Sequence, residues 1–192
     1  MLDEFWAAVT GKPTRSKEKD HIKCRGYVNE IYKTSPEIQF MVRQLQNRNC
    51  AFKKKILKCI PCAEQITGGF HPEKGILLCE NSVNKSLLRD TILHELVHYY
   101  DNCVYDMENW QNCYLHACSE IRAAHLSGDC RWFNEFRRGH FEFTGHLQDC
   151  VKRRAALSLK GNPNCTKDPD QYVNAVFDKC FKNLEPFGQI YR

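Results

Sequence analysis

The amino-acid sequence predicts an α+β fold: one mainly helical domain that carries a small β-hairpin and is rich in disulfide bonds. The longer apolar patterns recur at helical spacing, two short apolar segments flank a Pro/Gly turn, and 12 cysteines are spread along the chain. With 192 residues, of which 42% are hydrophobic, the chain can bury one core and is short for two. We therefore expect a single domain over residues 23–192.

The chain begins with a predicted arm, followed by a helical region. Residues 1–22 are polar and charged and contain Gly11 and Pro13, which is typical of a flexible N-terminal arm. They contain no apolar signal region and no Arg-rich amphipathic stretch, so we expect neither a secretory signal nor a cleaved transit peptide. Residues from about 36 to 58 carry apolar side chains at helical spacing, which fits one helix or two.

Two short apolar segments, residues 66–70 and 75–79, predict a β-hairpin because they are separated by His71-Pro72-Glu73-Lys74. The second segment comes shortly before the next helix. We therefore expect Ile76, Leu77 and Leu78 to form an edge strand, to which an extended peptide could bind by strand addition.

The helical pattern that follows covers about residues 86–102. Its apolar positions recur at the spacing of a single stripe that faces a core; they are Leu93, Leu96, Val97 and Tyr100. A second helix is expected over residues 109–126, with Gly128 placed to end it. A C-terminal helix is expected near residues 171–182.

The charge of the chain is modest, with a formal net charge of +5. A nucleic-acid binder would concentrate its basic residues in one stripe, whereas here they are scattered. Residues 131–143 alone combine basic with aromatic side chains, and we expect this segment to be partly helical. We expect no nucleic-acid partner. No apolar run approaches the roughly 20 residues of a membrane-spanning helix.

The cysteines form an even and dispersed set, which indicates a disulfide framework and an oxidising compartment. The mitochondrial intermembrane space would reconcile such a framework with the lack of an export signal. The alternative is a reduced protein with a zinc site at Cys59 and Cys62, although this pair has no second Cys-x-x-Cys partner.

The motif that carries chemistry is His94-Glu95-Leu96-Val97-His98. On a helix its two histidines lie one turn apart on the same face, so both imidazoles can reach one Zn²⁺ at about 2.1 Å. Glu95 would lie beside the metal and take a proton from the attacking water. The sequence therefore predicts a zinc metalloendopeptidase with one Zn²⁺ per chain and Glu95 as its catalytic base.

A third protein ligand is needed, and the sequence leaves candidates open. Asp101 lies on the same helix face as His98, but it is far from His94 along the helix axis for a short side chain. A hydrogen bond to a ligand imidazole is therefore a better role for Asp101 than direct binding of the metal. Glu120, in Glu120-Ile121-Arg122-Ala123, resembles the gluzincin arrangement, in which such a glutamate on the next helix completes the zinc triad. A histidine such as His116 is the remaining alternative.

Several motifs taken in order resemble the mitochondrial inner-membrane-associated metalloproteases that act in ATP synthase assembly. The resemblance covers about residue 24 to the end of the chain. The segments that carry it are Gly68–Phe70, His94–His98 with Asp101, Ala117–Ala124, Leu126–Cys130 and Glu185–Gly188.

The resemblance implies a minimal gluzincin-like zincin fold in a disulfide-rich protein of the intermembrane space, bound peripherally to the inner membrane. It implies an enzyme that removes the N-terminal prosequence of ATP synthase subunit 6 or degrades other inner-membrane and intermembrane-space proteins. A chaperone role in assembly of the membrane sector is also implied. The alternative is an assembly chaperone that retains the fold without proteolysis.

Overall fold

The computed structural model describes residues 18–62, 66–81, 84–105, 107, 109–131, 136, 139 and 146–188. The secondary structure is mainly helical with one small sheet, which confirms the predicted α+β class. The chain forms two compact units, residues 1–106 and residues 107–192. The predicted domain of residues 23–192 includes parts of both units.

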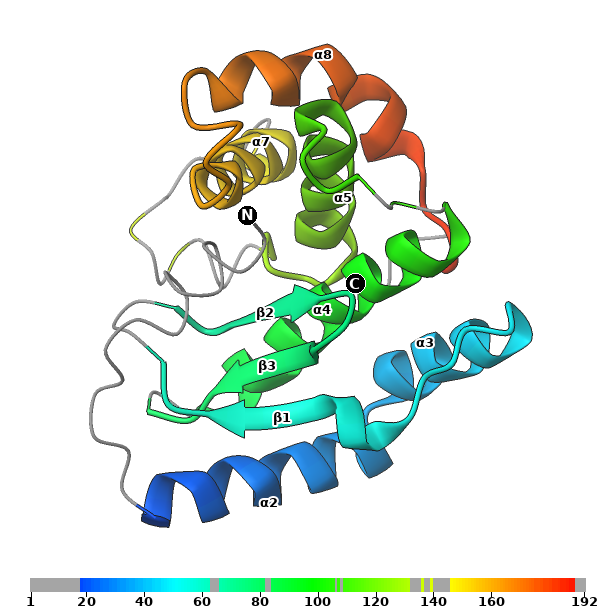
Figure 1. Ribbon diagram of the computed structural model, residues 1–192, viewed down its shortest axis with the longest axis vertical. Coiled ribbons are helices and arrows are strands. Elements are labelled where there is room, and N and C mark those ends of the chain that lie inside the picture. Colours follow the sequence, from blue (N-terminus) through cyan, green and yellow to red (C-terminus); the bar gives the residue numbers. More distant parts are fainter. Residues whose placement is uncertain are drawn as a thin grey trace. The chain divides into compact units, whose positions relative to one another are not determined.

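Three strands form the sheet of the first unit in the order β1-β3-β2 (Figure 1). β1 (Leu57–Ile60) runs parallel to β3 (Gly75–Cys79), and β2 (Gly68–His71) runs antiparallel to β3. The β2–β3 hairpin is the one that the sequence predicts. β1 is a strand that we did not predict, because its four residues continue the helical apolar spacing of the preceding segment.

The position of β3 corrects one expectation. Ile76, Leu77 and Leu78 lie in the central strand, whose backbone pairs with β1 on one side and with β2 on the other. They therefore do not form an edge strand, and no further peptide can add beside them. The edges of this sheet are β1 and β2, and strand addition would have to use one of these two.

The turn of the hairpin is stabilised by a side chain and by a glycine. The Nδ1 atom of His71 accepts hydrogen bonds from the backbone N–H groups of Glu73 and Lys74, at 3.1 and 3.3 Å. Gly75 has a φ of +88°, and a Cβ at this position would lie 2.8 Å from the carbonyl oxygen of Ile56. This turn therefore requires glycine at residue 75.

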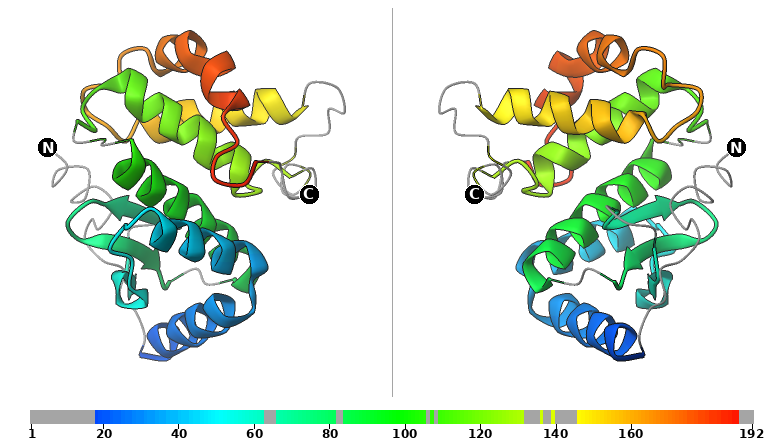
Figure 2. Two further views of the ribbon diagram at one scale, coloured as in Figure 1. Left: turned by 90° about the vertical axis from the view of Figure 1, so that its right-hand side faces the viewer. Right: turned by 90° about the vertical axis from the view of Figure 1, so that its left-hand side faces the viewer.

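The first unit also contains three α-helices: α2 (Glu18–Thr34), α3 (Pro36–Asn47) and α4 (Lys85–Val104). α4 packs against β2 and β3, and α2 packs along β1 (Figures 1 and 2). Asn84 caps the first turn of α4, because its side chain accepts hydrogen bonds from two backbone N–H groups of that turn. The helix that carries the histidine motif is thus anchored on a sheet and begins at a defined residue.

Two predictions for the N-terminal half need correction. α2 begins at Glu18, so residues 18–22 of the predicted arm are helical, and residues 1–17 lie outside the described residues. The helical pattern predicted to about residue 58 ends at Asn47, because Asn49 adopts a left-handed φ of 59° that a helix cannot continue. The chain then passes through a short 3₁₀ turn, Lys54–Ile56, into β1.

The second unit is built from helices α5 (Cys113–Leu126), α7 (His146–Leu159) and α8 (Pro169–Lys182), each of which packs against the other two. α5 and α8 are the predicted helices, and α7 was not predicted. Gly128, with φ +82°, follows the end of α5 as expected. Most of the segment 131–143, predicted to be partly helical, lies outside the described residues.

All 12 cysteines are paired, which confirms the predicted framework. The pairs in the first unit are Cys24–Cys59, Cys50–Cys103 and Cys62–Cys79. The pairs in the second unit are Cys113–Cys165, Cys118–Cys180 and Cys130–Cys150. Each unit therefore has its own covalent framework. Cys59 and Cys62 bond to different partners, so the alternative of a thiolate zinc site at this pair is wrong.

A buried arginine of α5, Arg122, forms hydrogen bonds with the segment that follows α8. The Arg122 side chain is only 2% exposed. Its Nη1 donates to the carbonyl oxygen of Asn183 at 2.8 Å, and its Nη2 donates to that of Glu185 at 2.7 Å. The planar guanidinium presents two parallel donors, which match these two carbonyl oxygens.

We expect Arg122→Lys to lower the free energy of unfolding by about 3 kcal/mol. The lysine ammonium group cannot donate to both carbonyl oxygens as the planar guanidinium does. A buried carbonyl oxygen that loses its donor costs about 1–3 kcal/mol. Urea unfolding of the oxidised protein, followed by circular dichroism, measures this change. Lys160→Ala at an exposed position is the control and should shift stability by less than about 0.5 kcal/mol. Equal midpoints for Arg122→Lys and wild type would contradict the assigned role.

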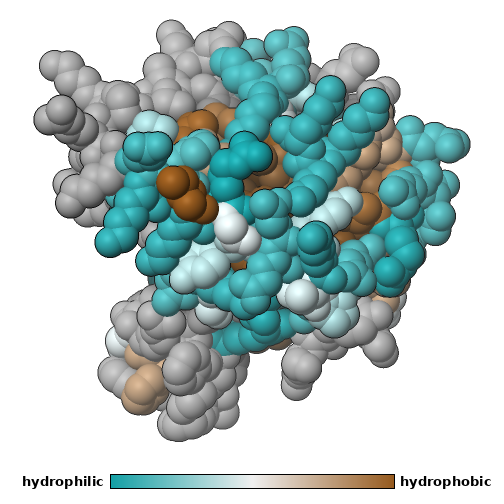
Figure 3. Space-filling model, turned by 90° about the horizontal axis from the view of Figure 1, so that it is seen from below, coloured by the Kyte–Doolittle hydropathy of each residue, from teal (hydrophilic) through white to brown (hydrophobic). Residues whose placement is uncertain are grey.

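Among the residues that the structure describes, no helix has both the length and the apolar character needed to cross a membrane. On the face drawn in Figure 3, hydrophilic side chains predominate among the coloured residues.

Candidate metal centre

α4 carries the two histidines of the motif on one face. His94 and His98 are one turn apart, and their ring centroids are separated by 4.8 Å. The predicted apolar stripe of the same helix is fully buried, with Leu93, Leu96, Val97 and Tyr100 at most 3% exposed. Packing of that stripe fixes the rotation of α4 about its own axis. The helix therefore presents both imidazoles in one direction.

Glu95 lies between the two histidines in the sequence and is also buried, with 6% of its surface exposed. Tyr99 follows His98, and its ring packs edge to face against Phe52 and Phe70, with ring centroids 5.6 Å apart in each pair. Desolvation by burial raises the pKa of the Tyr99 hydroxyl above its ordinary value.

α5 carries Glu120. This residue is 6% exposed, and the Nε2 atom of His116, one turn earlier on the helix, lies 3.3 Å from its Oε1. The N-terminus of α5 is capped by Asn112, whose side chain accepts hydrogen bonds from the backbone N–H groups of Tyr114 and Leu115. Glu120 is therefore a buried carboxylate on a well-anchored helix.

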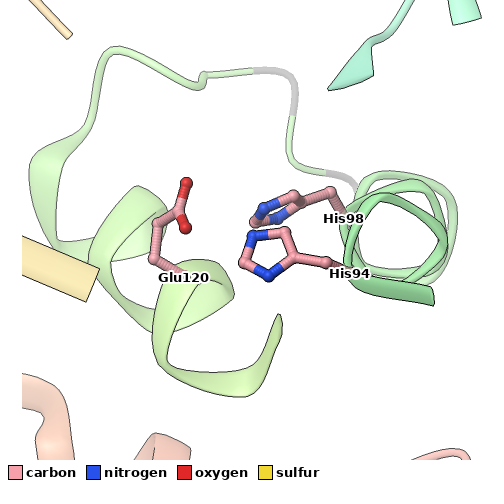
Figure 4. Close-up of side chains that lie close together, drawn as sticks. All are labelled: His94, His98 and Glu120. Carbon is pink, nitrogen blue, oxygen red and sulfur yellow. The ribbon is translucent and has the colours of Figure 1, made fainter. Parts of the chain in front are cut away.

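Among the described residues, His94, His98 and Glu120 form a group of potential metal ligands. Each offers one ligand atom, and these atoms lie within 4.8 Å of one another. Figure 4 shows the Glu120 carboxylate beside the two imidazole rings. Two imidazoles and one carboxylate are the donor set of many catalytic zinc sites, in which a fourth position remains open. The chemistry of these residues therefore fits a divalent zinc ion.

The other candidates for a third ligand have different positions. Asp101 is buried on α4, 1% exposed, and does not belong to this group. His116 is hydrogen-bonded to Glu120, and its Nδ1 atom lies 3.0 Å from the amide nitrogen of Asn162. His125 stacks on Phe181, with ring centroids 4.0 Å apart. Of these candidates, Glu120 is the one that belongs to the group of potential metal ligands with His94 and His98.

Asn162 is the polar residue of this region that sequence reasoning missed. It lies after α7, remote from the motif in the sequence, and nothing in its local pattern indicates a role. It could have been found only through its contact with His116.

Comparison with known proteins places the chain among peptidases. The model of the peptidase M76 family matches residues 22–188. A "Mitochondrial inner membrane protease ATP23" of Saccharomyces cerevisiae (strain Lalvin EC1118) is 42% identical over 189 residues, which cover 93% of this chain and 83% of that protein. Its namesake in Schizosaccharomyces pombe is 41% identical over 92% of this chain and 97% of its own length. The protein of the same name from Vanderwaltozyma polyspora is 46% identical, over 88% of this chain and 73% of its own length. No solved structure matches.

Proposed function

Because this chain belongs to the peptidase M76 family, we propose that it is a zinc-dependent metalloendopeptidase with one Zn²⁺ held by His94, His98 and Glu120. The observation that carries this proposal is the convergence of two imidazoles and one carboxylate within 4.8 Å. The sequence motif supplies two of the ligands, and the buried position of Glu120 beside them supports it as the third.

The chain's own residues have separate roles in the proposed reaction. When bound, the metal acts as a Lewis acid that activates a water molecule and polarises the scissile carbonyl. Glu95 takes the proton of that water as general base and passes it to the leaving nitrogen of the peptide. Asp101, buried one turn after His98 on α4, is proposed to orient a ligand imidazole.

The proposed compartment is supported by the relatives and by the cysteines. The relatives are named as proteases of the mitochondrial inner membrane. Six disulfides need an oxidising environment to form and persist. We therefore propose that the protein resides in the intermembrane space, associated peripherally with the inner membrane.

The proposed substrates come from the family resemblance of the motifs. They are the N-terminal prosequence of ATP synthase subunit 6 and other proteins of the inner membrane or the intermembrane space. A chaperone role in assembly of the membrane sector is proposed beside proteolysis.

The ligand assignment has a direct test. Wild-type protein should contain one zinc per chain by elemental analysis, and Glu120→Ala should lose it because two imidazoles alone leave the site without its third ligand. Asp101→Ala removes the other candidate carboxylate, which is buried on α4. It should retain more zinc than Glu120→Ala does, because Asp101 is proposed to orient a ligand imidazole and not to bind the metal. If Asp101→Ala loses zinc and Glu120→Ala retains it, the assignment is reversed.

The substrate proposal is tested by importing wild type and Glu95→Gln into mitochondria depleted of the endogenous protein. We expect wild type to restore both subunit 6 processing and ATP synthase assembly, and Glu95→Gln to restore only assembly. Restoration of both by Glu95→Gln would favour the non-proteolytic chaperone. Restoration of neither by Glu95→Gln would make proteolysis of a client essential for assembly.

A further inference from the structure

We propose that Asn162 and His116 act as a positioning pair for Glu120, in which His116 is held as its Nε2–H tautomer and donates a hydrogen bond to the carboxylate. This inference rests on the proposed function, because it identifies the residues that orient one of the proposed metal ligands. All three residues lie in the second unit. His116 and Glu120 are one turn apart on α5, and Asn162 follows α7.

The orientation of the Asn162 amide is set by two backbone groups. Its Nδ2 atom donates to the carbonyl oxygen of Trp110 at 3.0 Å. Its Oδ1 atom accepts from the backbone N–H of Asn164 at 3.1 Å. A carbonyl oxygen can only accept and a backbone N–H can only donate, so the amide cannot be flipped without losing both bonds.

This orientation determines the tautomer of His116. The Nδ2 group of Asn162 carries two hydrogens, and the one not directed at Trp110 is available to the Nδ1 atom of His116, 3.0 Å away. Nδ1 must therefore accept, which leaves the proton of the neutral ring on Nε2. Nε2 lies 3.3 Å from Oε1 of Glu120, and a carboxylate only accepts. The hydrogen bonds thus run in one direction, from Asn162 through His116 to Glu120.

The surroundings make this arrangement effective. Asn162 and His116 are each 9% exposed and Glu120 is 6% exposed, so water competes little for these bonds. The Trp110 ring packs edge to face against the His116 ring, with centroids 5.5 Å apart, and limits its rotation. A carboxylate has acceptor positions on both oxygens, so a bond from His116 leaves capacity for a metal. Hydrogen-bond partners that orient a ligand in this way typically change metal affinity by about 10–100-fold.

A second histidine on the same helix provides an internal comparison. The Nδ1 atom of His125 lies 3.1 Å from the carbonyl oxygen of Phe181. Because that oxygen can only accept, His125 must carry its proton on Nδ1. The structure therefore predicts opposite tautomers for two buried histidines of α5.

The first experiment determines both tautomers by nitrogen-15 NMR of the imidazole rings in wild-type protein, without and with added Zn²⁺. The expected result is Nε2–H for His116 and Nδ1–H for His125. A His116 ring protonated on Nδ1, or on both nitrogens, would overturn the proposal. This measurement needs no substitution, so it decides the proposal even if a variant fails to fold.

The second experiment measures metal affinity by competition with a chromogenic chelator for Zn²⁺, and the ligand field by the visible spectrum with Co²⁺. His116→Leu removes the donor and keeps an apolar volume, and we expect about 10–100-fold weaker Zn²⁺ binding with an altered Co²⁺ spectrum. His125→Leu, equally buried on α5, should bind Zn²⁺ as wild type does.

The outcomes separate this inference from the proposed function. Wild-type affinity and an unchanged Co²⁺ spectrum in His116→Leu would overturn the positioning pair while leaving Glu120 as a ligand. Retention of zinc by Glu120→Ala would instead overturn the ligand assignment, and with it the role of the pair.

Discussion

Glu95→Gln is expected to reduce peptide hydrolysis by about 10²–10⁴-fold, the usual contribution of a positioned general base. Glutamine has nearly the same volume as glutamate but cannot accept the proton of the attacking water. Because Glu95 is proposed as a base and not as a ligand, the variant should keep its zinc, its disulfides and its thermal stability. The measurements are the cleavage rate of a peptide mixture followed by mass spectrometry, and elemental analysis of the same sample.

Asp90→Asn is the matched control for this prediction, since Asp90 is also a buried acidic residue on α4 and forms an ion pair with its neighbour Arg89. It should retain hydrolysis close to the wild-type rate. If the Glu95→Gln variant cleaves peptides at the wild-type rate, Glu95 is not the base. If neither wild type nor the variants cleave any peptide, the chain does not act as a peptidase by itself.

Removal of the metal is expected to abolish hydrolysis completely and reversibly. Dialysis against a strong chelator should reduce activity to background, and stoichiometric Zn²⁺ should restore it, because the remaining side chains cannot by themselves activate water at neutral pH. No proposed ligand is a thiol, and the disulfides do not depend on the metal. Non-reducing mass spectrometry should therefore find no free thiols in the metal-free protein.

Substitution of a ligand should reproduce the effect of the chelator. His98→Ala should lose both zinc and activity, and added Zn²⁺ should not restore them at stoichiometric concentration. His21→Ala is the control, since this histidine is half-buried on α2, is hydrogen-bonded to Glu80 and does not belong to the group of potential ligands. Full activity of the chelated protein, verified to be free of zinc, would contradict the metallopeptidase mechanism.

The pattern of the sequence was sufficient for some elements of the fold and not for others. The helix of residues 86–102 was predictable because a long amphipathic stripe has only one regular conformation that buries it. The β2–β3 hairpin was predictable because Pro and Gly mark its turn. The sequence pattern does not predict α7. It also extends a helix into β1, because four residues do not reveal a period.

The candidate site divides in the same way. His94, Glu95 and His98 are neighbours in one motif, so their common face follows from helical geometry alone. The choice between Asp101 and Glu120 as third ligand does not follow from the geometry of one helix, because Glu120 lies on a second helix.

The sequence by itself determined that the chain has a histidine-glutamate motif on a helix, a local hairpin and a dispersed set of cysteines that form disulfides. These features depend on residues close together in the chain or on composition. Only the tertiary structure decided that β3 is the central strand, which cysteines pair, and that Asn162 contacts His116. Such contacts join residues that are far apart in sequence, and they are selected by the packing of whole elements against one another, which no local pattern specifies.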